Sequence, residues 1–484
     1  MNPAPWQRLD PRMLLVHPVL EMVKFLPVLF GIVVAGSASG LGWWTLIGVG
    51  LPIVIGVVRY LTTTWRVTDE RVELRRGLLQ RHTLSTPVDR VRAVDLTATL
   101  IHRLLGLETV HIGTGSTAAS EEQLDLDALP RAQATALRTD LLQTRSAPPM
   151  PAAADTVASP MPPPAPEHVV ARFSPRWLWY APLSGTIVVT AGAVAGVSAQ
   201  LIQSVDFRVT EDDLSGLHTG LVLAMAAGVL LLAVTLVVAG YLVTNGGFVL
   251  ARQGAAWHVR RGLFTRRETS IDVARMAGIS IAEPAMLRLA RGRKVDAIVT
   301  GFARGQSDSA TLLPPTPGEL ATKVSIAVLG DSEPAAGRLR RHGRSAVTRR
   351  YRRALLAASP IVGLLLITAT ERALAGWLIG AVLVVAAALA LASDRARSMG
   401  HGLLQGYVVM RSGSVLRRRD VLAATHVIGW NLRATWFQRR AGLVTVTATT
   451  AGGRGYISVD DMPGADALAL AEGATPGLVG QFTC

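Results

Sequence analysis

Residues 75–115 read RRGLLQRHTLSTPVDRVRAVDLTATLIHRLLGLETVHIGTG. The stretch holds a turn glycine, a polar alternating run, and a short apolar and basic segment before a second β-rich run. The alternation predicts β-strands, and the apolar segment predicts a short helix or an irregular crossing. The stretch decides the fold because the same signals return twice further along the chain.

Two constant offsets relate this stretch to later segments. An offset of 185 carries Gly77, Arg81, Arg90, Val94, Arg103 and Leu104 onto Gly262, Arg266, Arg275, Ile279, Arg288 and Leu289. An offset of 336 carries Gly77, Arg81, Arg103, Gly106, Leu107 and Val110 onto Gly413, Arg417, Arg439, Gly442, Leu443 and Val446. The sequence therefore predicts one unit written three times, referred to below as the first, second and third copies.

The composition predicts a membrane protein with a cationic side. Half of the 484 residues are hydrophobic, the mean hydropathy is +0.35, and only 17% of the residues are charged. Even so, 49 Lys and Arg against 34 Asp and Glu leave a net charge of +15. The one cysteine, Cys484, excludes a disulfide within the chain.

Three pairs of apolar runs predict six transmembrane helices arranged as three hairpins. The first pair occupies His17 to Tyr60 and is broken at Ser37–Gly40. The other runs are Trp177 to Leu201, Leu217 to Val243, Ala354 to Thr370 and Leu374 to Ala392. A cleaved signal peptide is the alternative for the first run, but paired runs in the later copies favour a hairpin.

Charge decides the predicted orientation. The hairpin loops carry Asp206, Glu211, Asp212, Asp213 and Glu371 against Arg208 and Arg372, so the rest of the chain holds the positive excess. Positive charge close to a span stays in the cytoplasm. We therefore expect a multi-pass protein of the cell membrane, with both termini and all three soluble modules in the cytoplasm.

The predicted domain order alternates hairpins, modules and linkers. It comprises a lead and hairpin 1 (1–61), module 1 (62–145), a Pro/Ala-rich linker (146–167), hairpin 2 (168–243), module 2 (244–329), an Arg-rich linker (330–353), hairpin 3 (354–393) and module 3 (394–484). Helical spacing after Pro130 predicts a C-terminal helix for the first module.

The first copy resembles the bacterial pleckstrin-homology-like (PH-like) membrane domain. The similarity rests on Gly77-Leu78-Leu79, on Pro87 with Arg90-Val91, and on Leu104 to Leu107. The second copy lacks the proline and the Leu-Gly-Leu, and the third has His426 in place of the arginine. The resemblance implies a membrane protein of the α+β class, in which each hairpin is followed by a small, partly open β-barrel with a C-terminal capping helix. It implies no catalytic residues.

The sequence offers no catalytic constellation, metal-ligand spacing or cofactor motif, so we expect neither enzyme activity nor a cofactor. Arg103, Arg288 and Arg439 recur in every copy. They have two interpretations, contact with an anion or lipid headgroup, and pairing with a carboxylate inside the fold; the second is favoured. The turn glycines at 77, 262 and 413 are expected to supply a positive φ.

A run of arginines between the second and third copies is the clearest candidate binding site. It has no acidic residue and comprises Arg338, Arg340, Arg341, Arg344, Arg349, Arg350, Arg352 and Arg353. Such a cluster beside a span attracts anionic lipid. Nucleic acid is the competing partner, but the adjacent span and the scarcity of aromatic residues favour lipid headgroups.

The sequence therefore predicts a non-catalytic binding or scaffold protein at the inner face of the cell membrane, with the first module carrying most of the binding. Anionic lipids are the expected partners, together with an unidentified protein for which another PH-like membrane protein is one candidate. A transporter or channel component is the alternative; against it, the centres of the predicted spans lack ionisable residues.

Overall fold

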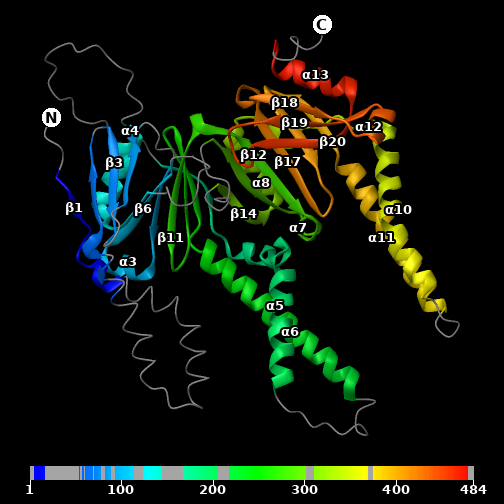
Figure 1. Ribbon diagram of the computed structural model, residues 1–484, viewed down its shortest axis with the longest axis horizontal. Helices are drawn as coiled ribbons and strands as arrows, with labels where there is room; N and C mark the ends of the chain where they lie inside the picture. The colour runs from blue at the N-terminus through cyan, green and yellow to red at the C-terminus, as the bar shows by residue number, and fades with distance from the viewer. Residues whose placement is uncertain are drawn as a thin grey trace. The chain divides into compact units, whose positions relative to one another are not determined.

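The computed structural model describes residues 5–16, 54, 57–58, 60–68, 70–77, 82–88, 93–113, 124–143, 167–204, 217–300, 310–368 and 374–477 (Figure 1). These form two compact units. Unit 1 combines residues 1–168 with 251–271 and 301–303, and unit 2 holds 169–250, 272–300 and 304–484. The division falls inside the predicted second module; the predicted domain boundaries stay a prediction.

Unit 1 contains two antiparallel sheets. The first sheet runs in chain order through β1 (Gln7–Arg8), β2 (Thr64–Val67), β3 (Arg71–Arg76) and β4 (His82–Pro87). The second places strands in the order β7 (Leu124–Pro130), β6 (Leu107–Gly113), β5 (Ala93–Ala98), β11 (Arg266–Asp272) and β10 (Ala256–Arg261). Leu74 on β3 of the first sheet and Val94, Val110 and Leu126 on the second are fully buried and belong to one core, that of unit 1. Helix α4 (Arg131–Gln143) follows β7, as its spacing predicts.

Unit 2 contains a six-stranded sheet and a three-stranded sheet. The six-stranded order is β14 (Thr311–Pro317), β13 (Gly292–Val299), β12 (Met276–Pro284), β17 (Leu416–Ala423), β16 (Tyr407–Ser412) and β15 (Gly400–Leu404). The three-stranded order is β18 (Gly429–Arg433), β19 (Leu443–Thr449) and β20 (Tyr456–Pro463). Helices α8 (Gly318–Leu329) and α13 (Gly464–Ala474) follow β14 and β20. Strands β8 (His168–Arg172) and β9 (Val249–Gln253) lie where the chain passes between the units.

The same succession of elements occurs three times among the described residues. A strand, a short helix, two strands and a longer helix follow one another, and the short helices are α3 (Leu100–Leu105), α7 (Ala285–Leu289) and α12 (Trp436–Arg440). The strand pairs also share one register, because Ala93 faces Gly113, Ile279 faces Ala297, and Gly429 faces Thr449. After the two sequence offsets are subtracted, all three pairs belong to a single alignment.

Local chemistry explains the short helices of the first and third copies. Thr99 and Thr435 cap α3 and α12 with their side chains, and the cap at Thr435 is a reciprocal capping box with Gln438. The residues after these helices include Gly106 and Gly442, with φ of 69° and 66°. The turn glycines 77, 262 and 413 also have positive φ, as predicted, with values of 110°, 105° and 95°.

The structure contradicts the prediction of six transmembrane helices in three hairpins. Among the described residues, two helices are long and apolar enough to cross a membrane, at Leu223–Asn245 and Leu374–Ser398. They belong to α6 (Leu217–Asn245) and α11 (Leu374–Ser398). Most of the first predicted pair, His17 to Tyr60, lies outside the described residues. Strands of successive copies also share sheets, because β5 pairs with β11 and β12 pairs with β17.

The other two predicted spans are shorter than the sequence suggested. The Trp177 run begins with two 3-10 helices, η2 (Pro175–Tyr180) and η3 (Pro182–Ser184), and Trp177 is buried between Phe173 and Phe248. Helix α5 (Thr186–Ser204) starts only after this break. Helix α10 (Gly343–Ile367) is continuous, but its apolar part from Ala354 spans only about 21 Å. A hydrocarbon core is about 30 Å thick.

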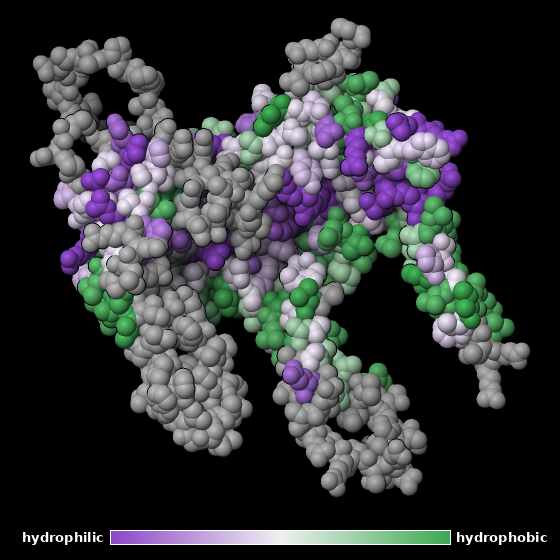
Figure 2. All heavy atoms as spheres, in the orientation of Figure 1, coloured by the Kyte–Doolittle hydropathy of each residue, from purple (hydrophilic) through white to green (hydrophobic). Residues whose placement is uncertain are grey.

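The α10–α11 pair exposes apolar side chains over much of its length (Figure 2). Examples are Leu356, Leu364 and Ile367 on α10 and Ile379 and Leu383 on α11. Only 6% of the apolar window of α11 is buried within the chain. Within unit 2, α5 and α6 leave the sheets on the same side as α10 and α11 (Figure 1). Exposed apolar surface of this extent indicates association with a membrane.

Candidate functional site

The arginine run lies at the base of the α10–α11 pair, where the polar part of unit 2 meets the exposed apolar helices (Figure 2). Arg338, Arg340 and Arg341 precede α10, and the other five arginines lie in its first three turns. The structure divides the eight into three groups according to what their guanidinium groups contact.

Arg349 and Arg350 belong to a buried ion-pair network. Asp461, on β20, is fully buried; Arg349 Nε lies 3.1 Å from its Oδ1 and Arg350 Nη2 lies 2.8 Å from its Oδ2. Arg350 also contacts Asp460 at 3.3 Å, and Gln438 donates to Asp461 Oδ1 at 2.9 Å. Burial lowers the pKa of Arg350, and the carboxylate of Asp461 counteracts this. These two arginines attach α10 to the third copy and are not available to a ligand.

Arg340 has a structural contact of its own. Its backbone pairs with His401 on β15, and its side chain lies 3.1 Å from Asp466 at the start of α13. The guanidinium is still largely exposed, so the ion pair is weak.

The remaining arginines form an exposed cationic group, which we call the arginine collar. It comprises Arg338, Arg341, Arg344, Arg352 and Arg353, all of them exposed. Within the part of the chain that the structure describes, none makes an ion pair or a side-chain hydrogen bond. The collar directly precedes the exposed Leu355 and Leu356. Long arginine side chains at such a boundary hold their charges at the level of lipid headgroups.

Two of the repeated arginines converge on one carboxylate in unit 2. Arg288, on α7, donates to both carboxylate oxygens of Asp394 at 3.0 Å. Arg417, on β17, donates to Asp394 Oδ1 at 2.9 Å, and Ser414 donates to Oδ2 at 2.9 Å. For Arg288, the carboxylate-pairing interpretation therefore describes the observed contact.

The corresponding arginines in unit 1 have different surroundings. Arg103 donates from Nη1 to the carbonyl of Leu263 at 3.0 Å. Arg266, on β11, makes no ion pair or side-chain hydrogen bond with any residue that the structure describes. The sequence offset that carries Gly262 onto Gly413 places Val243 where the third copy has Asp394, so the carboxylate has no equivalent at that position.

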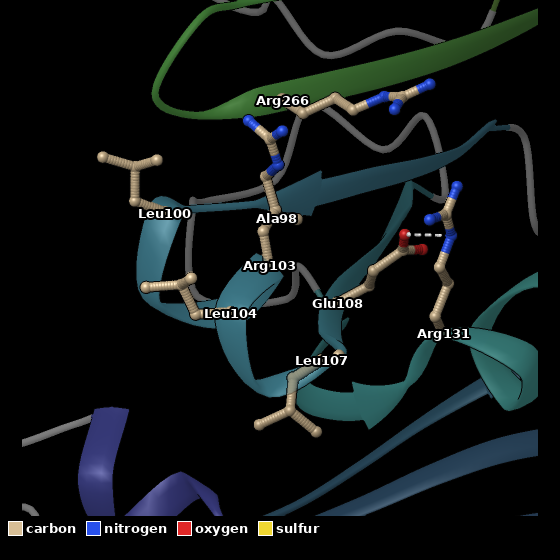
Figure 3. Close-up of a pocket in the computed structure, with 9 residues that line it drawn as sticks. Ala98, Leu100, Arg103, Leu104, Leu107, Glu108, Arg131 and Arg266 are labelled. Atoms are coloured by element: carbon tan, nitrogen blue, oxygen red, sulfur yellow. Dashed lines mark ion pairs between the residues drawn. The ribbon is translucent and has the colours of Figure 1, made fainter.

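Arg103 and Arg266 line a cavity of about 360 Å³ at the junction of β5 and β11 (Figure 3). The cavity is also lined by Ala98, Leu100, Leu104, Gly106, Leu107, Glu108 and Arg131. In Figure 3 the two guanidinium groups point apart. We call this cavity the arginine pocket. By their positions in the repeat, Arg103 and Arg266 correspond to Arg288 and Arg417, the two arginines that bind Asp394.

The carboxylate of Glu108 partly neutralises the positive charge of the arginine pocket. Its Oε1 lies 3.4 Å from Arg131 Nε. Burial raises the pKa of Glu108, while the positive charge of Arg131 acts in the opposite direction. The raised pKa means that the carboxylate takes up a proton more readily than an exposed one, which leaves the pocket more cationic as the pH falls.

The other repeat-signature residues are not brought together into one site. Arg81 and Arg90 lie outside the described residues. The carbonyl of Arg275 accepts hydrogen bonds from the backbone and side chain of Thr300. Arg439, on α12, is exposed. Among the described residues, no group of three or more His, Cys, Asp or Glu side chains lies close enough to hold a metal ion.

Sequence reasoning missed the acidic partners. Asp394 and Asp461 lie far along the chain from some of the arginines they bind, and neither falls in a motif. Aligning the second and third copies on their turn glycines would have singled out Asp394, because the second copy has Val243 at the same position.

Comparisons with known proteins cover the two ends of the chain. Neither the curated proteins nor the solved structures contain a match to it. The second copy and the whole arginine collar lie outside the matched regions, because the first match ends at residue 145 and the second begins at residue 359. Residues 22–145 and 359–473, which hold the first and third copies, are similar to the family described as the bacterial PH domain.

Proposed function

We propose that this protein is a non-catalytic, membrane-anchored binding protein whose arginine collar contacts anionic lipid headgroups. One observation carries the proposal: five exposed arginines without acidic partners among the described residues directly precede the exposed apolar part of α10. The similarity of both ends of the chain to the bacterial PH domain supports a binding or scaffold role rather than turnover.

The proposed orientation follows from the same charges. Anionic lipid in the cytoplasmic leaflet attracts a juxtamembrane arginine by about 1 kcal/mol. Positive charge beside a span also stays on the cytoplasmic side. With the C-terminal ends of α6 and α11 facing the cytoplasm, the collar and the sheets of unit 2 lie on that side of the membrane.

The arginine pocket is a second element of this proposal. Asp394 shows which group a pair of arginines at such a junction holds, and the first junction presents Arg103 and Arg266 without that carboxylate. A phosphate-sized anion fits this chemistry, because arginine recognises phosphate and carboxylate alike. Leu104 beside it is 85% exposed and offers an apolar contact for the rest of a lipid.

The test of the collar uses full-length protein in a mild detergent, titrated with phosphatidylglycerol or phosphatidylcholine and read by native mass spectrometry. Replacing Arg344, Arg352 and Arg353 with Gln removes three collar charges. At about 1 kcal/mol per charge, retention of phosphatidylglycerol should fall roughly a hundredfold. Retention of phosphatidylcholine should change little.

A matched control removes three exposed positive charges elsewhere, at Arg71, Arg267 and Lys323. It should leave phosphatidylglycerol retention unchanged. Rising salt should weaken binding to the unaltered protein, since it shortens the range of electrostatic attraction. Equal losses in the two triple variants, or salt-insensitive retention, would contradict the proposed role of the collar.

The pocket needs its own variant, because it is separate in the chain from the collar. Arg103→Gln with Arg266→Gln should abolish binding of one anion while leaving collar-dependent lipid retention in place. Inorganic phosphate and phosphatidylglycerol are the two probes. Saturation by phosphate alone identifies a free anion as the ligand, and saturation by the lipid alone identifies a headgroup. Unchanged binding of both in the double variant would remove the pocket from the proposal.

A further inference from the structure

The chain joins its successive copies by strand pairing, and the two junctions are alike. In unit 1, Arg266 on β11 faces Ala98 on β5. In unit 2, Arg417 on β17 faces Glu283 on β12. In the numbering of the first copy, both pairs join position 98 of one copy to position 81 of the next. The junction is thus a repeated feature with a fixed register.

One arginine contact accompanies each junction. Arg103 donates to the carbonyl of Leu263 at 3.0 Å, and Arg288 donates to the carbonyl of Ser414 at 3.4 Å. Both acceptors directly follow a turn glycine of the next copy. The strand register and the arginine contact together define how a strand of one copy pairs with a strand of the next.

In the third copy the equivalent of β5 and β12 is β18, and no strand of a further copy pairs with its outer edge among the described residues. In the part of the chain that the structure describes, β18 pairs with β19 on one side only. Leu432 on β18 is 39% exposed, whereas the equivalent Leu96 and Ile281 are 5% and 3% exposed at the occupied junctions. Arg439, the equivalent of Arg103 and Arg288, makes no side-chain hydrogen bond or ion pair with a described residue.

The first copy presents the complementary edge. Strand β4 is the equivalent of β11 and β17, the strands that are received at the two junctions. Among the described residues it pairs with β3 and ends its sheet. The side chains of His82 and Thr83 on it are exposed. One chain therefore carries both halves of a third junction, one at each end of the repeat order.

We propose that β18 receives β4 of a second molecule of this chain, so that molecules associate head to tail. The shared register then places Leu432 opposite Thr83 and Trp430 opposite Ser85. Arg439 lies where Arg103 and Arg288 lie at the other junctions, with the turn at Gly77 replacing those at Gly262 and Gly413. Unpaired strand edges favour such addition, and a heterologous contact of this kind extends into rings or filaments.

Cysteine cross-linking tests the pairing in full-length protein in mild detergent. All variants carry Cys484→Ser, and one preparation adds Leu432→Cys while another adds Thr83→Cys. Facing residues of an antiparallel pair are about 4.5–5.5 Å apart, within reach of a disulfide. Mild oxidation of the mixture should give a dimer several-fold more abundant than in either preparation alone.

The matched control replaces Thr83→Cys with Arg267→Cys. Arg267 is exposed on β11, the equivalent of β4, but the edge of that strand is already occupied by β5. It should give no dimer above background with Leu432→Cys. A double variant carrying Leu432→Cys and Thr83→Cys in one chain separates pairing between molecules from pairing within one.

Three results would overturn the proposal. The first is a mixture that cross-links no better than the Arg267→Cys control. The second is a predominance of dimers joined through position 432 of both molecules, which would indicate a symmetric contact. The third is an intrachain disulfide in the double variant without cross-linking in the mixture. In agreement with the proposal, light scattering should show a mass that rises with concentration and falls when Leu432 is replaced by Asp.

Discussion

Arg291 stands in the second copy where the first and third copies have Gly106 and Gly442. Its φ is 57°, in the left-handed region that those glycines occupy at 69° and 66°. A residue with a Cβ atom pays roughly 1–2 kcal/mol for this conformation. The second copy also lacks a threonine cap before its short helix, since Pro284 occupies that position without a side-chain hydrogen bond.

Replacing Arg291 with Gly should therefore raise the free energy of unfolding by about 1 kcal/mol. The side chain is exposed, so little packing is lost with it. Thermal unfolding in detergent, followed by circular dichroism, measures the change. Arg291→Ala is the control and should not stabilise the protein, because alanine keeps the Cβ atom. Equal stabilisation by both variants would show that backbone strain is not the cause.

Asp394 gives a second residue-level prediction. Asp394→Asn removes the charge that Arg288 and Arg417 share and leaves two guanidinium groups facing each other. Hydrogen bonds to charged groups contribute about 1.5–3 kcal/mol, so the variant should have a free energy of unfolding that is lower by roughly 2 kcal/mol. Its unfolding temperature should fall accordingly. Inorganic phosphate should restore part of the loss in the variant and have little effect on the unaltered protein. A variant as stable as the original would show that Asp394 does not hold this junction.

At the scale of single elements, the start of α10 depends on two buried histidines. His342 precedes the helix and His401 lies on β15, with ring centroids 5.2 Å apart. His342 Nδ1 also contacts the carbonyl of Asp460 at 3.1 Å. Burial, followed by the charge of His342, lowers the pKa of His401 to about 4. Burial also lowers the pKa of His342.

Acid should consequently loosen the base of α10. A histidine with a lowered pKa is neutral in the folded protein, so its contribution is complete above its ordinary value of 6.5 and is lost as the pH falls from there toward 4. At 1.36 kcal/mol per pKa unit, His401 accounts for roughly 3 kcal/mol over that interval. Unfolding temperatures measured between pH 7 and pH 4 test this.

The variant His401→Phe should flatten the pH dependence, because an uncharged ring of similar size cannot take up a proton. His82→Gln, at an exposed histidine on β4, should leave the dependence as it is. A profile that is unchanged in His401→Phe would assign the acid sensitivity to other groups.

The elements show which features could be predicted from sequence. Helix α4 was predicted because its spacing and proline signals are local, and the segment of α3 was predicted to be either a short helix or an irregular crossing. The pairing of β5 with β11 was not, since it joins residues some 170 positions apart through backbone groups that carry no sequence signature. Arg349 and Arg350 looked like the other arginines of the run, and only the fold reveals Asp461 beneath them. The six predicted spans were wrong in part because hydropathy alone did not show that Pro182 and Gly185 interrupt one run, or that α10 ends at Ile367 and shortens another.

At the scale of the whole molecule, membrane insertion is directly measurable. Single cysteines at Arg338, Ile379 and Leu468, in a Cys484→Ser background, report three environments. Ile379 lies on the exposed surface of α11 and should resist a water-soluble maleimide, because its surface faces lipid. The other two should react only after the cells are permeabilised, if the collar and the third copy are cytoplasmic. Labelling of Arg338→Cys in intact cells would reverse the orientation, and ready labelling of Ile379→Cys would exclude insertion of α11.

The buried carboxylate of Asp461 also determines when α10 can pack against the third copy during synthesis of the chain. A ribosome delivers α10 about a hundred residues before β20, so Arg349 and Arg350 enter the nascent chain well ahead of the acid that neutralises them. Until the last strand has been made, the hairpin cannot be fastened to the third copy without burying uncompensated charge. Translation that stops short of residue 456 would leave the α10–α11 pair with a loose base, a form that proteases of the cell could distinguish from the finished protein.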